Sequence, residues 1–69
     1  MKMVKVIEVI GTSEKGFTEA TENAVKEAAR TVKNIQSIYI KHMHAKVEND
    51  KIVSYAVNAK ISFIVEHLQ

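Results

Sequence analysis

Val4-Lys5-Val6-Ile7-Glu8-Val9-Ile10-Gly11-Thr12-Ser13 is the stretch that decides the fold of this chain. Its β-branched residues predict a strand from about Met3 to Ile10 with apolar side chains on both faces. The glycine and the hydroxyl residues that follow predict the end of the strand and a capped helix start, with an acidic residue in the turn. One helix can cover only one face of such a strand. We therefore expect a neighbouring subunit to bury the other.

The length and composition limit the classes of protein that fit. A chain of 69 residues holds one domain, residues 1–69, and domains this short usually need disulfides, a metal or oligomerisation to be stable. Cysteine is absent, which excludes disulfides and thiolate metal sites and leaves oligomerisation. A net charge of +2 is too small to imply nucleic acid. With no membrane-length apolar run and no signal-peptide pattern, we expect no membrane partner and a cytoplasmic location.

A helical pattern follows the first strand, from Phe17 to about Lys33. Apolar and small residues recur there at steps of three and four, which predicts one buried helix face. The members of this stripe are Phe17, Ala20, Thr21, Ala24, Val25, Ala28 and Val32. Because the stripe is rich in alanine, we expect the helix to lie close against a sheet.

Two long strands follow, Ile35–Val47 and Ile52–Val65, joined by the polar turn Glu48-Asn49-Asp50-Lys51. The second strand alternates apolar and polar residues, which predicts a clear core face. A hairpin centred on the turn pairs Ile38 with Ile61, Tyr39 with Lys60, Ile40 with Ala59, Lys41 with Asn58 and Met43 with Ala56. The expected fold is α+β: a β-α-β-β unit whose three-stranded antiparallel sheet, in order 1-3-2, partly wraps one helix.

The chain resembles the dodecins over nearly its whole length. The resemblance rests on Val6-Ile7-Glu8-Val9-Ile10-Gly11-Thr12-Ser13, on the alanine-rich helix, on Thr31-Val32 at its end and on the closing Lys60-Ile61-Ser62-Phe63. It implies the same β-α-β-β protomer, assembled as twelve copies into a hollow shell of cubic symmetry. It also implies storage or buffering of a flavin, FMN or riboflavin, which stacks in pairs between aromatic side chains near a two-fold axis.

Two positions depart from what the resemblance implies for a flavin site. The flavin-stacking Trp of the family falls on Ser37, and the Gln that contacts the isoalloxazine ring falls on Ala56. Serine cannot replace the stacking area of an indole, and alanine offers neither donor nor acceptor to the ring edge. The two positions are on the order of 20 Å apart within one protomer. They could share a ligand only across a subunit boundary, and we expect flavin binding to be weakened or lost.

The remaining ring systems of the hairpin give two further candidates. Tyr39 is expected on the face of the sheet away from the helix and could stack on a ligand, with a plain surface or interface tyrosine as the alternative, whereas Tyr55 is expected in the core.

His42 and His44 point to the same side of a strand, and imidazoles bind zinc, nickel or copper. Two ligands are too few for a closed site unless copies converge on an axis. The register places the pair opposite Val57 and Tyr55, which favours simple packing instead.

The acidic residues offer weaker candidates. Some dodecins without the aromatic residue resemble calcium binders, and the turn at Glu48-Asn49-Asp50 clusters oxygen atoms of the kind calcium prefers, although such turns are generally just solvated. Glu8 interrupts an apolar strand, and we expect it to form an ion pair between subunits.

The chain has no cysteine and no recognisable nucleophile, phosphate loop or carboxylate pair, so we expect no enzyme. The predicted function is a homododecameric shell that binds or stores a small molecule, of the flavin type by resemblance. The alternative is a structural or ion-binding dodecamer without a flavin function, holding calcium or another metal.

Overall fold

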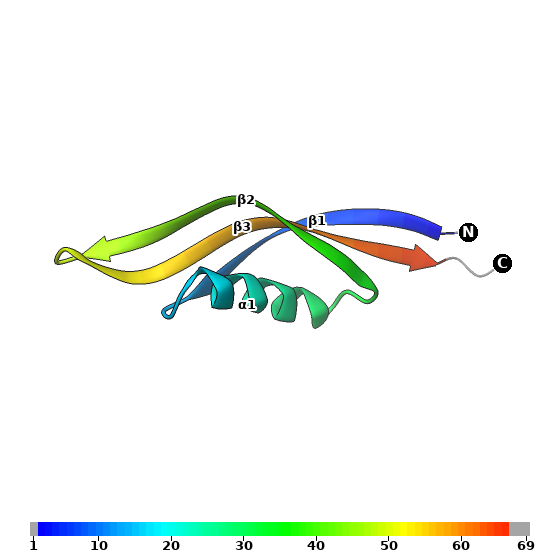
Figure 1. Ribbon diagram of the computed structural model, residues 1–69. Helices are drawn as coiled ribbons and strands as arrows, with labels where there is room; N and C mark the ends of the chain where they lie inside the picture. Colours follow the sequence, from blue (N-terminus) through cyan, green and yellow to red (C-terminus); the bar gives the residue numbers. More distant parts are fainter. Residues whose placement is uncertain (1, 67–69) are drawn as a thin grey trace.

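The computed structural model describes residues 2–66, which form one helix packed on one face of a three-stranded sheet (Figure 1). The elements are β1 (Lys2–Ser13), α1 (Phe17–Ala29), β2 (Ile35–Glu48) and β3 (Lys51–Glu66). The strand order is β1-β3-β2 and every pairing is antiparallel. This confirms the predicted β-α-β-β fold and the central place of the last strand.

The sheet has an inner face, which the helix covers, and an outer face, which no element covers in Figure 1. On the inner face Ile7, Val9 and Gly11 of β1 pair with Ile61, Ala59 and Val57 of β3. On the outer face the even-numbered residues of β1 pair with the even-numbered residues of β3, among them Glu8 with Lys60 and Thr12 with Ala56. The predicted alternation of β3 is therefore correct.

The core is small and lies between the helix and β3. Its fully buried apolar residues are Ala20, Ala24, Ala28, Val57, Ala59 and Ile61. Gly11 is the reason that the helix can come so close: a Cβ atom at this position would lie 2.1 Å from the carbonyl oxygen of Ala20 and 2.7 Å from the Cβ of Ala24. The predicted close approach of an alanine face is thus confirmed.

The ends of the first two elements differ from the predictions. Gly11-Thr12-Ser13 was expected to close the strand, but β1 continues through Ser13 because Gly11 pairs with Val57 and Ser13 with Tyr55. The helix has Gly16 at its N-cap and no side-chain cap. Instead, the Ser13 hydroxyl accepts from the Lys15 backbone N–H at 2.9 Å and donates to the Glu19 carboxylate at 2.8 Å.

The helix also ends at Ala29 rather than near Lys33. Its last turn tightens, because the backbone N–H of Arg30 bonds to Glu27 and that of Thr31 bonds to Ala28. Asn34 then adopts a positive φ of 63°, a conformation that cannot continue a helix.

The hairpin register is correct from Ile38 to Ile40 and again beside the turn, where Val47 pairs with Ile52 and Glu48 with Lys51, and it is wrong from His42 to Lys46. Ile38, Tyr39 and Ile40 pair with Ile61, Lys60 and Ala59 as predicted. A bulge between Ile40 and His42 then leaves Lys41 unpaired, so that His42 rather than Lys41 pairs with Asn58, and His44 rather than Met43 pairs with Ala56. The turn itself is correct: Asn49 and Asp50 have φ values of 52° and 63°, as a two-residue hairpin turn requires.

Across residues 2–66, no helix has the length and apolar character needed to span a membrane.

Candidate functional site

The outer face of the sheet carries the candidate ligand residues Ser37, Tyr39 and Ala56 and the histidine pair, whereas the calcium candidate lies at the hairpin turn. Four rows cross the outer face, each read from β1 through β3 to β2: Val6-Ser62-Ser37, Glu8-Lys60-Tyr39, Ile10-Asn58-His42 and Thr12-Ala56-His44. The β1 column alternates apolar and polar residues, whereas the β3 and β2 columns are mostly polar and contain no carboxylate. A ligand lying on this face therefore meets apolar surface on one side and hydroxyl, amide, amine and imidazole groups on the other.

The two positions of the family flavin site lie on the outer face, as predicted, but Ser37 is in the first of these rows and Ala56 in the last. Ser37 is exposed, and its hydroxyl lies 2.6 Å from the hydroxyl of Ser62, its cross-strand partner. Ala56 is half-buried beside His44. A pair of hydroxyl groups that bond to each other offers no flat apolar surface, so nothing at Ser37 replaces a stacking ring.

The two tyrosines of the hairpin lie on opposite faces. Tyr39 projects from the outer face with 71% of its surface exposed, so most of its ring is accessible to solvent in the single chain. Tyr55 packs against the core, and its ring meets Phe17 edge to face at a centroid distance of 4.9 Å. The prediction that Tyr55 belongs to the core is confirmed, whereas a ligand role for Tyr39 stays a prediction.

His42 and His44 do share one face, but the predicted partners were wrong. Because the register shifts at Lys41 and again between Lys46 and Val47, they lie opposite Asn58 and Ala56, on the outer face with Tyr39, and both are exposed. Among residues 2–66, no group of three or more histidine or acidic side chains is placed to hold a metal ion. Coordination at this pair would therefore need donors from another copy of the chain.

The bulged residue itself makes a contact that the sequence analysis missed. Lys41 reaches across β3 to β1, where its Nζ lies 3.5 Å from a carboxylate oxygen of Glu8. The sequence predicts an ion pair between subunits for Glu8, and within the chain this carboxylate already has Lys41 as a partner. The sequence gives no sign of the bulge, since no glycine or proline lies beside Lys41.

Asn58 is a second residue that sequence reasoning missed. It lies at the centre of the outer face, between Ile10 and His42. Its side-chain oxygen Oδ1 is buried and has no hydrogen-bond partner among the described residues. A buried carbonyl without a donor is uncommon in folded proteins, and it marks a place where another molecule can supply one.

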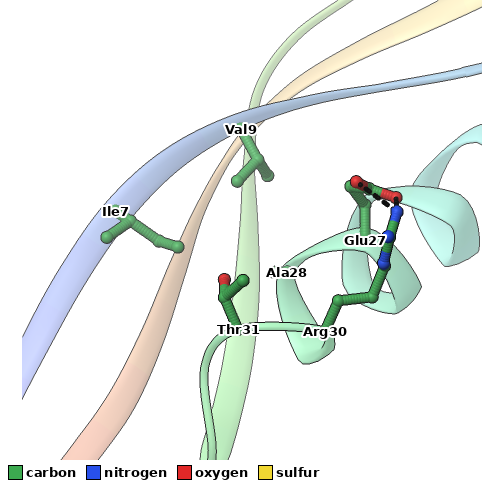
Figure 2. A pocket seen from close by; sticks show the side chains of 6 residues that line it. All are labelled: Ile7, Val9, Glu27, Ala28, Arg30 and Thr31. Carbon is green, nitrogen blue, oxygen red and sulfur yellow. Dashed lines mark hydrogen bonds and ion pairs between the residues drawn. The ribbon is translucent and has the colours of Figure 1, made fainter.

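The helix side of the sheet offers a cavity of a different kind. It measures about 440 Å³ and is lined by Ile7 and Val9 of β1, by Glu27 and Ala28 of α1, and by Arg30 and Thr31, which follow the helix (Figure 2). Its charged groups, Glu27 and Arg30, face each other at 3.2 Å in an exposed ion pair. These charges are already paired, and the only other polar side chain of the wall is that of Thr31, so the cavity has few free polar groups to orient a ligand.

Comparison with known proteins gives a consistent result. A family model described as Dodecin matches residues 3–66. The dodecin of Thermus thermophilus is 26% identical over 65 residues, which cover 94% of either chain. The structure of dodecin from Streptomyces coelicolor matches with a TM-score of 0.90 at 27% identity, over 97% of this chain and 96% of that one. A calcium-chelating dodecin from Mycobacterium tuberculosis matches over the same shares, with a TM-score of 0.80 at 27% identity.

Proposed function

Because the chain belongs to the dodecin family, we propose that it assembles into a homododecameric shell that binds or stores a small molecule of the flavin type. One domain, residues 1–69, forms the repeating unit. The role of the assembly is to bind a ligand rather than to catalyse a reaction. The location of the assembly in the cytoplasm stays a prediction.

The observation that carries this proposal is the uncovered apolar column of β1. Val4, Val6 and Ile10 are each more than half exposed on the outer face, although β-branched residues usually occupy covered strands. Contact with further copies would remove this apolar surface from water, which favours assembly. The family fold agrees with such an arrangement, because contacts between protomers of a shell would cover faces that are exposed in a single chain.

The ligand lies, in this proposal, on the outer face of β2 and β3, where the family positions Ser37 and Ala56 are found. Binding is weaker than in a dodecin with the stacking Trp and the ring-contacting Gln, because a serine hydroxyl pair and a methyl group replace them. Tyr39 exposes a phenol ring on this face.

A fluorescence titration tests the proposal. The protein is added to a fixed concentration of FMN or riboflavin while flavin emission is followed, and we expect weak but saturable quenching. The double variant Ser37→Trp with Ala56→Gln restores both family contacts, and we expect it to bind riboflavin at least about tenfold more tightly. Absence of quenching at high wild-type protein concentration would rule out flavin binding, and an unchanged affinity in the double variant would rule out the placement of the ligand.

The similarity to a calcium-chelating dodecin favours a second candidate function, an ion-binding shell without flavin. Two places in the chain offer donors. Glu48 and the turn at Asn49 and Asp50 supply oxygen atoms, although the Glu48 carboxylate lies 3.2 Å from Lys46. The exposed pair His42 and His44 supplies imidazoles for zinc or nickel. Calorimetric titration with calcium and with nickel distinguishes these sites, since only the second loses its heat signal in a His44→Ala variant.

A further inference from the structure

Two apolar surfaces of the chain are uncovered, and they lie on opposite faces of the sheet. The first is the β1 outer patch, whose members are each more than half exposed: Val4, Val6 and Ile10. The second is the β2 inner column, which shares its face with the core and consists of Ile35, Ile38, Ile40, Met43, Ala45 and Val47. Apart from Met3, Tyr39 and Ile52, every large apolar side chain that is exposed among residues 2–66 belongs to one of these two surfaces.

The β2 inner column is uncovered because α1 packs over β1 and β3 and hardly touches β2. The column contains no polar side chain, yet Ile40, Met43 and Val47 expose between 39% and 60% of their surface. The outer residues of the same strand are polar, among them Ser37 and His42. A strand that turns its apolar side to water over such a length indicates a missing partner.

The helix and the β2 inner column enclose a groove. It measures about 460 Å³, and it is lined by Thr21, Glu22, Val25, Lys26 and Ile38. The sequence predicts Thr21 and Val25 for the buried stripe of the helix, but both are only half-buried because they line this open groove. Met43 lies in the row of Val57 and Gly11, over which the helix packs. The groove is therefore apolar at its floor and flanked by the helix.

We infer that the β1 outer patch of one copy of the chain docks in this groove of a second copy, against its β2 inner column. The sheet arches over the helix (Figure 1), so the patch stands on the convex side and the column is recessed on the concave side. Two recessed columns cannot meet each other, whereas β1 is an edge strand and can enter a groove. Glu8 interrupts the patch, but its charge is paired with Lys41 at 3.5 Å.

The surface that the chain exposes in excess is of the size that such a contact needs. The single chain exposes 5384 Å², about 1,000 Å² more than a compact monomer of its mass. This excess is comparable to the roughly 800 Å² that one partner contributes to a stable interface. Because both surfaces consist of aliphatic side chains, their removal from water favours the contact.

The contact joins two different surfaces, and this determines its place in the proposed shell. Twelve copies in cubic symmetry are related only by two-fold and three-fold rotations, and a contact across a two-fold axis joins identical surfaces. The contact of the β1 outer patch with the groove therefore lies around a three-fold axis, where three copies close into a ring. This placement rests on the proposed function and goes further, because it assigns the surface that covers the first strand.

Cross-linking of the whole chain tests the inference, since the chain contains no cysteine. The double variant Val6→Cys with Met43→Cys carries one thiol in the patch and one in the column. These thiols lie on opposite faces of the sheet and on its two edge strands, so that links form between chains rather than within one. A flexible bismaleimide tolerates an offset between the two surfaces. We expect a covalent trimer as the largest product on a denaturing gel, because a closed ring of three ends there.

Two kinds of control accompany this experiment. Each single variant should remain uncoupled, because a contact between different surfaces keeps like residues apart. The matched double variant Val6→Cys with Thr18→Cys moves the second thiol to an exposed position on α1 outside the groove, and it should give little trimer. Covalent dimers of Met43→Cys alone, or equal amounts of trimer in the two double variants, would refute the contact.

Charged variants give a second, independent measurement. Val6→Asp and Met43→Asp should each lower the light-scattering mass, because a carboxylate enters an apolar contact. A mixture of the two retains one intact pairing, between the patch of the Met43→Asp chain and the groove of the Val6→Asp chain. The mass of the mixture should therefore be about twice that of either variant alone.

The outcomes distinguish this contact from the proposed function. If the wild type is a monomer, the shell fails and the contact fails with it. If the wild type assembles but the aspartate variants keep its mass, the shell stands and the contact is refuted. A mixture no heavier than its components would refute it as well, because the two surfaces would then not be partners.

Discussion

At the scale of single residues, Gly11 does more for the fold than any other position in the first strand. Its missing side chain lets α1 approach the sheet so closely that a Cβ atom would lie 2.1 Å from a backbone oxygen of the helix. The backbone cannot yield as a flexible side chain can. Gly11 is therefore a packing glycine, and no positive φ is involved.

Replacement of Gly11 by alanine should destabilise the protein by at least about 2 kcal/mol, because the helix must move away from the sheet. Thermal unfolding at one protein concentration measures this, and a loss of that size lowers the melting temperature by about 8 °C or more in a domain of this size. The matched control is Gly16→Ala, since a Cβ at Gly16 meets nothing within 4 Å. Equal melting temperatures for the two variants would contradict this explanation.

The residues of the candidate site were predictable only in part. The outer position of Ser37, Tyr39 and Ala56 follows from the alternation of two strands, and it was predicted correctly. The unpartnered oxygen of Asn58 was not predictable, because it depends on which neighbours reach the amide, and a strand pattern does not contain that information.

At the scale of elements, the alanine stripe of α1 determines how the helix and the sheet pack. Ala20, Ala24 and Ala28 lie four residues apart and are all nearly inaccessible to water, so they form one continuous line of contact with β1 and β3. Small side chains on this line bring the backbones close. This part of the fold was predictable, since the spacing and size of the residues are both visible in the sequence.

A larger side chain in this line should separate the layers. Ala24→Leu is expected to cost about 1–3 kcal/mol of unfolding free energy through overpacking. Ala29→Leu is the matched control, because Ala29 belongs to the same helix but is exposed, and leucine is a good helix former. Urea unfolding of the two variants measures the difference, and a stability of Ala24→Leu equal to that of the control would show that the contact is looser than described.

The hairpin shows where element prediction fails. A bulge adds one residue to one strand and shifts the pairs beyond it until a second irregularity compensates, here between Lys46 and Val47, while the local composition stays that of a strand. The sequence around Lys41 has no glycine or proline to mark it. As a result, the register was correct from Ile38 to Ile40, and the faces of His42 and His44 were predicted wrongly.

At the scale of the whole molecule, the single chain exposes more surface than a compact protein of its mass. Its accessible surface is 5384 Å², against about 4,400 Å² expected for a monomer of 7.8 kDa. Its radius of gyration is 14.5 Å, against about 11 Å for a compact domain of this length. The long axis of 58 Å explains both values, because the strands extend far beyond the helix.

This open shape agrees with the prediction from chain length that the protomer needs partners. Among residues 2–66, only six apolar residues are buried, while Val4, Val6 and Ile10 remain exposed on the outer face. The sequence predicts assembly from a strand that is apolar on both sides, and assembly stays a prediction. The arrangement of the copies could not be predicted in the same way, because it depends on how surfaces of separate chains fit.

The measurement that tests the central claim most directly is the mass of the purified protein in solution, by light scattering at micromolar concentration. The dodecin-type shell predicts a single species of twelve times the 7.8 kDa of one chain. A monomer or a dimer at that concentration would contradict it.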